Sequence, residues 1–169
     1  MFESLIKAYE EDSYEGEILY KKGIIPVIIT APHTIRQVRE NGEIKLEEPF
    51  TKAIAKYVGE EADCFYLIKN KDTGIDSNKS LNDPFKSMLI DIIKDNDIKL
   101  VIDLHGAKRE RNFDVELGTL NNLSSDYSTI KELIDAFNEN EQQLLQILRN
   151  CGFLKNLSDA TSIVENPFK

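Results

Sequence analysis

The two histidines of this chain, His33 and His105, are the side chains best suited to chemistry, because each closely follows an apolar run. His105 comes after the run 98–104, and Asp103 lies two positions before it. Because side chains alternate along a strand, Asp103 and His105 are expected to project to the same side. The carboxylate would then orient an imidazole that binds a metal or takes part in catalysis. The alternative is an aspartate and a histidine that are satisfied at a strand end without any ligand.

Both apolar runs predict strands, one leading to His33 and one leading to His105. In open parallel sheets, ligands collect outside the carboxyl ends of the strands, so the two imidazoles are expected to lie close together. Two neutral imidazoles and one carboxylate form a common catalytic zinc set. The sequence therefore predicts one divalent metal ion, zinc. A metal-free core in which two histidines happen to end strands is the alternative.

Hydrophobic periodicity divides the chain into helices and strands. Helices are predicted at 2–10, 51–61, 84–95 and 127–149, the last of them broken near 138–141. Strands are predicted at 16–23, 24–30, 64–69, 98–104 and 113–118. The first two strands are expected to form a hairpin with its turn at Lys22 and Gly23. The polar segment 35–47 is expected to form a loop or a small hairpin that overhangs His33.

The order of these elements predicts an α/β fold. The strand 64–69, the helix 84–95 and the strand 98–104 form a βαβ unit, which favours parallel pairing. We expect the strands near 25–30 and 99–104 to lie in the interior of the sheet, either side by side or one strand apart. The length predicts a single α/β domain, 1–169.

Composition narrows the range of partners. The chain has 169 residues and a net charge of -9, which argues against nucleic-acid binding. No apolar run approaches the length of a membrane span, so no membrane partner is expected. Cys64 and Cys151 are only two and lie far apart, so we expect reduced thiols. These features predict a cytoplasmic protein, and they leave its oligomeric state open.

Five short motifs follow one another at predicted strand ends and helix starts. They are Ala31-Pro32-His33, Glu48-Pro49-Phe50-Thr51, Asp76-Ser77-Asn78, Asp103-Leu104-His105-Gly106 and Asn166-Pro167-Phe168. In this order they resemble the N-formylglutamate amidohydrolase family, and the resemblance covers residues 24–118 well. It implies a phosphorylase/hydrolase-like core similar to that of zinc carboxypeptidases, with a mixed, mostly parallel sheet flanked by helices on both faces.

The resemblance also assigns roles to residues. It makes His33, Glu48 and His105 the metal ligands, and it makes Asp76 and Asn78 substrate-binding residues of an active-site loop. On composition alone, a carboxylate near a helix start suits the helix dipole, and polar loop residues are usually only solvated. The predicted function is that of a zinc-dependent amidohydrolase, which cleaves an amide or peptide-like C–N bond in a small, carboxylate-bearing substrate.

Charged residues near and beyond His105 complete the predicted site. Arg109 and Arg111 are candidates for binding the substrate carboxylate, with surface salt bridges as the alternative. Relatives continue beyond the last motif to a late strand with an acidic residue near the metal, so the chain resembles a short or C-terminally truncated member. Glu116 is then the candidate general base, although it also fits an exposed strand carboxylate. Asp103 is expected to orient a ligand imidazole. The alternative function is a catalytically inactive or regulatory metal-binding relative.

Overall fold

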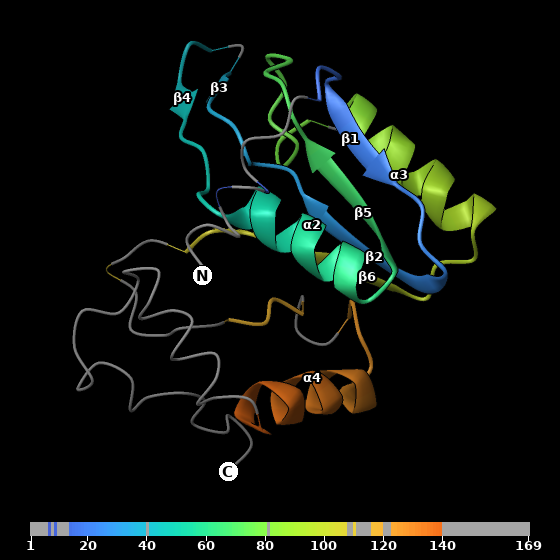
Figure 1. Ribbon diagram of the computed structural model, residues 1–169. Helices are drawn as coiled ribbons and strands as arrows, with labels where there is room; N and C mark the ends of the chain where they lie inside the picture. The colour runs from blue at the N-terminus through green and yellow to red at the C-terminus, as the bar shows by residue number, and fades with distance from the viewer. Residues whose placement is uncertain are drawn as a thin grey trace. The chain divides into compact units, whose positions relative to one another are not determined.

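The computed structural model describes residues 7, 9, 14–39, 41–80, 82–107, 110, 116–119 and 123–139 (Figure 1). The chain divides into two compact units, one of residues 4–107 and one of residues 1–3 with 108–169. The predicted helix at 2–10 is described only at Lys7 and Tyr9, which are both helical. Most of the predicted strand 113–118, Cys151 and the last of the five motifs lie outside the described residues.

The larger unit is built on a four-stranded sheet. Its strands follow the order β1 (Ile18–Lys21), β5 (Cys64–Lys69), β2 (Ile25–Ala31) and β6 (Leu100–Asp103). β1 is antiparallel to β5, whereas β2 is parallel to both of its neighbours. The predicted α/β class with a mixed sheet is therefore confirmed. The parallel pairs bring the carboxyl ends of β5, β2 and β6 to the same edge.

The predicted hairpin between the first two strands is wrong, because β5 lies between β1 and β2. The chain passes the end of β5 at Gly23, where a Cβ would lie 2.4 Å from the carbonyl oxygen of Asp63. That oxygen accepts hydrogen bonds from the backbone N–H groups of Ile24 (2.9 Å) and Ile25 (3.0 Å). A Lys-Gly pair between two apolar runs is compatible with a tight turn and also with this wider crossing. The chain takes the wider crossing because both β1 and β2 pair with the later strand β5.

β6 is an edge strand within the described residues, so the prediction of an interior strand near 99–104 is wrong there. Among those residues it pairs only with β2, in a register that sets Asp103 beside Thr30. Its side chains alternate between partly buried and exposed, and Val101 is 40% exposed. The predicted adjacency to the strand near 25–30 is confirmed. A short apolar run suits burial on one face or on both, so its sequence does not separate an edge from an interior.

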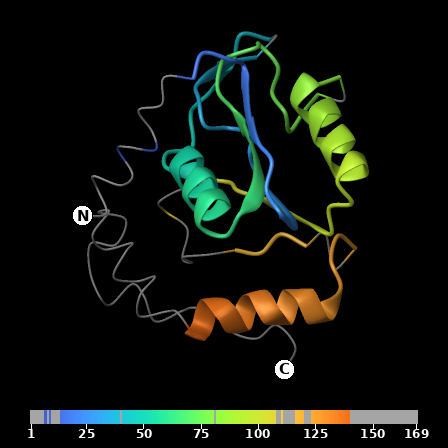
Figure 2. The same ribbon diagram turned by 45° about the vertical axis from the view of Figure 1, so that its right-hand side comes forward.

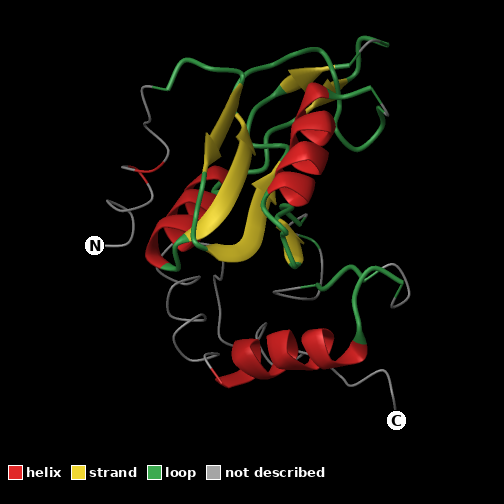
Figure 3. Ribbon diagram, turned by 90° about the vertical axis from the view of Figure 1, so that its right-hand side faces the viewer, coloured by secondary structure: helices red, strands yellow, loops and turns green. Residues whose placement is uncertain are grey.

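Two helices pack against the sheet (Figures 2 and 3). They are α2 (Thr51–Glu61) and α3 (Pro84–Asp95). α2 contributes Ala55 to a core cluster that includes Tyr66, and α3 contributes Phe85 to a second cluster that includes Leu67. Because Tyr66 and Leu67 are successive residues of β5, the two clusters lie on opposite faces of the sheet. Every residue of β5 is buried, so this strand lies at the centre of the core.

The predicted loop or small hairpin at 35–47 is a hairpin. Its strands are β3 (Gln37–Val38) and β4 (Ile44–Lys45). Gly42 adopts a φ of 79° at the turn, a conformation that glycine reaches without steric cost. The backbone N–H of Val38 donates to the carboxylate of Asp72 (3.1 Å), so the hairpin is tied to the loop 70–80.

In the smaller unit, the described residues include one helix, α4 (Tyr127–Glu139). Asp126 caps its first turn, and hydrogen bonds from the Ser128 hydroxyl and from Thr129 lower the pKa of Asp126 to about 2. The described part of the chain stops at Glu139, so the predicted break near 138–141 and the helix predicted beyond it lie largely outside the described residues. Among the helices that the structure describes, none has the length and the apolar character needed to cross a membrane.

Candidate metal centre

His33 lies two residues beyond β2, and its side chain is fully buried. Neither of its ring nitrogens makes a hydrogen bond of ordinary geometry with any described residue. Burial lowers the pKa of His33, and the nearby Glu48 carboxylate opposes that shift. Buried polar atoms are nearly always paired, and leaving one unpaired costs about 1–3 kcal/mol. A neutral imidazole with two unpaired nitrogens is therefore well suited to bind a metal ion.

His105 lies two residues beyond β6 and has a carboxylate on each side. Its Nε2 is 3.0 Å from Asp103 Oδ2, and its Nδ1 is 3.2 Å from Glu48 Oε2. The hydrogen bonds to Asp103 and to Glu48 raise the pKa of His105 to about 10. Asp103 is itself held by the Thr30 hydroxyl, which donates to Oδ1 from the neighbouring strand. Asp103 therefore orients His105, a choice between the two imidazoles that the sequence left open.

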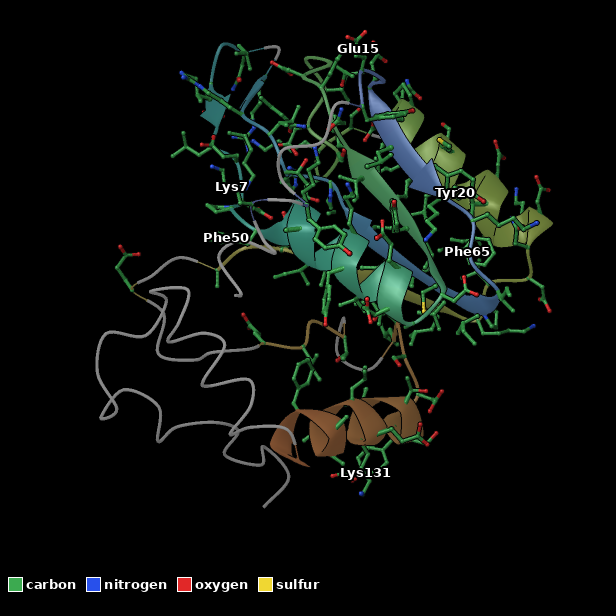
Figure 4. The ribbon with its side chains drawn as sticks, in the orientation of Figure 1. Lys7, Glu15, Tyr20, Phe50, Phe65 and Lys131 are labelled. Atoms are coloured by element: carbon green, nitrogen blue, oxygen red, sulfur yellow. The ribbon has the colours of Figure 1, made fainter. Side chains whose placement is uncertain are left out.

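Backbone contacts before α2 bring Glu48 back to the histidines. Its N–H donates to the carbonyl oxygen of His33 (2.8 Å), and its own carbonyl oxygen accepts from the Thr51 hydroxyl (2.8 Å). Phe50, which is labelled in Figure 4, lies in this turn with a left-handed φ of 69°. A conformation of this kind costs of order 1–3 kcal/mol in a residue other than glycine and persists where surrounding contacts enforce it. The turn therefore fixes the carboxylate of Glu48 beside His33.

The Glu48 carboxylate divides its oxygens between two sets of donors. Oε1 accepts from Lys45 Nζ (2.6 Å), and Oε2 accepts from the Gly106 N–H (2.9 Å). Burial tends to raise the pKa of Glu48, but hydrogen bonds from His105, Lys45 and Gly106 lower it to about 2. Gly106 permits this close approach, since a Cβ there would lie 3.0 Å from Glu48 Cβ. The carboxylate is therefore ionised and available as a ligand.

His33, Glu48 and His105 come together from three separate segments of the chain. Each offers one ligand atom, and these atoms all lie within 4.8 Å of one another. The two imidazole centroids are 5.3 Å apart, with the ring planes tilted by 42°. This spacing is close to what ligand bonds of about 2.0–2.2 Å span across one ion. The group could therefore hold a metal ion, as the motifs predicted.

Asp76 lies beside the other imidazole, with Oδ1 3.8 Å from His33 Nε2. Its Oδ2 accepts from Arg39 Nε (2.8 Å), and its Oδ1 accepts from the Asn78 N–H (2.9 Å). Burial tends to raise the pKa of Asp76, but these hydrogen bonds keep it below its usual value. The Asn78 side chain also lies near enough to the His33 ring to oppose the lowering of its pKa. Both loop residues that the resemblance assigned to the site therefore adjoin His33.

Two basic residues of the 35–47 segment hold carboxylates of this centre, and the sequence did not single them out. Arg39 holds Asp76, and Lys45 holds Glu48. Arg39, Asp76 and Lys79 also line a cavity of about 390 Å³. A single arginine or lysine on a polar segment shows no periodicity, so only the position of its partner identifies it.

Lys69, at the end of β5, is a buried cation that anchors the loop 70–80. Its side chain is 1% exposed, its ammonium donates to the carbonyl oxygen of Ile75, and Nζ lies 3.4 Å from Ser77 Oγ. Burial lowers the pKa of Lys69, and Asp83 opposes that shift. Its position directly after an apolar run was the sequence feature that could have identified it, because a buried charge needs partners.

Three of the predicted residues are not part of this cluster as described. Arg109 and Arg111 lie outside the described residues. Glu116 is exposed and belongs to the smaller unit. The roles predicted for these residues, in carboxylate binding and as general base, stay predictions.

No protein family, no curated protein and no solved structure matches this chain. The resemblance to the N-formylglutamate amidohydrolase family therefore rests on its motifs. The geometry of the candidate metal centre is the main support for any function.

Proposed function

We propose that this protein is a zinc-dependent hydrolase that cleaves an amide or peptide-like C–N bond in a small, carboxylate-bearing substrate, as N-formylglutamate amidohydrolases do. The observation that carries the proposal is the buried His33 imidazole, unpaired among the described residues, beside Glu48 and His105. A core similar to that of zinc carboxypeptidases and a cytoplasmic location belong to the same proposal.

The donor set favours zinc over harder divalent cations. Magnesium and calcium prefer ligand sets made of oxygen, whereas two imidazoles with one carboxylate are common at catalytic zinc sites. Zinc bound by His33, Glu48 and His105 would polarise the scissile carbonyl and lower the pKa of water to about 7.

Two further carboxylates would orient the ligand imidazoles. Asp103 holds Nε2 of His105, and Asp76 lies nearest to Nε2 of His33. A carboxylate on one ring nitrogen sets the tautomer and makes the other nitrogen the ligand atom. We therefore infer that His105 binds the metal through Nδ1.

A metal-binding protein without turnover is the second candidate. Hydrolysis needs a group that accepts a proton from the attacking water. The carboxylates that the described structure places beside the imidazoles, Asp76 and Asp103, are engaged by Arg39 and by Thr30. A general base would therefore have to come from another residue.

Glu48→Gln tests the metal centre, with Glu47→Gln as its matched control. Glu47 is the exposed neighbour, so its variant makes the same change of charge without touching the histidines. In a competition assay with a chelating dye, we expect the wild type and Glu47→Gln to bind one zinc ion. Glu48→Gln should bind zinc at least about tenfold more weakly, since loss of even an outer-shell partner costs that much. Binding that survives Glu48→Gln unchanged would place the third ligand elsewhere.

The zinc-loaded protein should release free amine from N-formyl-L-glutamate or from other N-acylated acidic amino acids. Neutral N-acyl amino acids are the comparison, and they should react more slowly. Zinc binding without hydrolysis of any of these compounds would favour the second candidate. A wild-type protein that takes up no zinc would contradict both.

A further inference from the structure

Lys45 brings a positive charge into direct contact with the proposed metal centre. Its Nζ lies 2.6 Å from Glu48 Oε1, and the two side chains are 25% and 10% exposed. Lys45 lies on β4 opposite Gln37 of β3, which is fully buried. The ammonium is therefore directed toward the metal centre by a paired backbone segment.

Lys45 makes the two oxygens of Glu48 unequal. Oε1 is covered by the ammonium, whereas Oε2 accepts from the Gly106 N–H and lies 3.2 Å from His105 Nδ1. A metal ion shared by Glu48 and His105 would therefore meet Oε2, and it would reach Oε1 only if Lys45 moved away. A carboxylate that binds through one oxygen leaves more of the coordination sphere open to water or substrate.

The Lys45 ammonium also opposes the binding of a metal cation to Glu48. Like charges on the same carboxylate repel, and the repulsion is only weakly screened where the carboxylate is largely buried. Lys45 should therefore lower the affinity of the centre for divalent ions while it keeps the carboxylate in place.

We propose that Lys45 is a positioning residue that restricts Glu48 to one-oxygen binding of the metal and lowers the metal affinity of the centre. The inference rests on the proposed function and adds a residue that none of the sequence motifs contains. It concerns how the metal is held, so it is tested on metal binding and does not require turnover.

The test compares the full-length wild type with Lys45→Met, Lys45→Arg and Lys79→Met. Lys79→Met is the matched control, because it removes the same charge from a side chain that is 62% exposed and pairs with Glu43 (3.8 Å). Zinc affinity is measured by chelator competition, and coordination is read from the visible absorption bands of bound cobalt(II), which weaken as the coordination number rises.

We expect Lys45→Met to bind zinc about tenfold or more tightly than the wild type, because the variant removes the repulsion between the ammonium and the bound ion. Its cobalt bands should weaken as the second oxygen of Glu48 enters the coordination sphere. Lys45→Arg and Lys79→Met should resemble the wild type in both measurements. Lys45→Gln takes the place of Lys45→Met if a melting curve shows that the methionine variant does not fold.

Any other pattern overturns the inference, including unchanged or weaker zinc binding by Lys45→Met, or tighter binding with unchanged cobalt bands. The result also separates this inference from the proposed function. A wild type that takes up no metal contradicts both, whereas Glu48-dependent metal binding with identical behaviour of Lys45→Met and Lys79→Met contradicts only the role of Lys45.

Discussion

The segments that follow β2 and β6 each place a histidine two residues beyond the strand, in opposite surroundings. His33 is fully buried, unpaired among the described residues, and has a lowered pKa. The His105 side chain is 38% exposed, lies between two carboxylates, and has a pKa raised to about 10. This difference in burial follows from the positions of the two strands in the sheet. β2 has a strand on each side, whereas β6 is at an edge of the described structure.

A histidine that binds a metal must have a deprotonated nitrogen and a fixed ring orientation, and the two histidines differ in which of these the fold provides. Burial makes His33 neutral, at the cost of two unpaired polar atoms among the described residues. The carboxylates orient His105 but stabilise a proton that a metal ion must displace. The two histidines should therefore contribute equally to metal binding and oppositely to the stability of the metal-free protein.

The largest expected effect is the loss of metal uptake in both His33→Leu and His105→Ala. In the presence of a chelator, the two variants should differ in free energy of unfolding, measured by urea denaturation. His33→Leu should match or exceed the wild type, because it removes two unpaired buried nitrogens, each costing about 1–3 kcal/mol. His105→Ala should stay folded but be less stable, because it removes the hydrogen bonds that His105 makes with Asp103 and Glu48. A destabilised His33→Leu would mean that His33 has a structural partner.

A smaller effect is expected from the carboxylates that adjoin the two rings. Asp103→Asn should weaken zinc binding about 10–100-fold, as is typical when the partner of a ligand histidine is lost. Asp76→Asn should weaken it less, since Asp76 lies 3.8 Å from its imidazole and Asp103 lies 3.0 Å from its own. Asp97→Asn is the control, since that side chain is 84% exposed and pairs with Lys99. Equal losses of zinc affinity in Asp103→Asn and Asp76→Asn would contradict the stronger role expected for Asp103.

The dependence of zinc affinity on pH should distinguish the two rings more finely. Above neutral pH, affinity should rise by up to about tenfold per pH unit, because one proton must leave His105, whose pKa is raised to about 10. His33 should add no proton release there, because burial lowers its pKa. Chelator competition at a series of pH values measures the slope. A slope of zero, or one unchanged by Asp103→Asn, would contradict the proposed protonation of His105.

The stability of the metal-free protein should vary with pH in a matching way. The raised pKa of His105 contributes stability that is complete below its ordinary value of 6.5 and is lost as the pH rises through about 10. The lowered pKa of Glu48 contributes stability that is present above its ordinary value of 4.5 and is lost as the pH falls toward about 2. The difference in melting temperature between the wild type and His105→Ala should therefore shrink progressively between about pH 6.5 and about pH 10. A difference that stays constant up to pH 11 would contradict this assignment.

The sequence by itself determined the elements and the ends of the strands that carry the histidines. Local patterns suffice for this, because the period of the apolar residues shows which face of an element is buried. The Asp83-Pro84 start of α3 is one example, since Asp83 accepts from the Phe85 N–H as a cap should. His33 and His105 belong with these features, because each follows a strand that the periodicity locates, whereas only the resemblance made Glu48 a candidate ligand.

Only the tertiary structure decided how those elements pair and which charges meet. The insertion of β5 between β1 and β2, and the edge position of β6, depend on competition among strands, for which a local pattern holds no information. The left-handed Phe50 and the contact of Lys45 with Glu48 depend on packing around them. Such contacts join polar residues without periodicity, and their free energy depends on burial by other parts of the chain. The sequence therefore located the candidate metal ligands, and the fold supplied the charged groups that contact them.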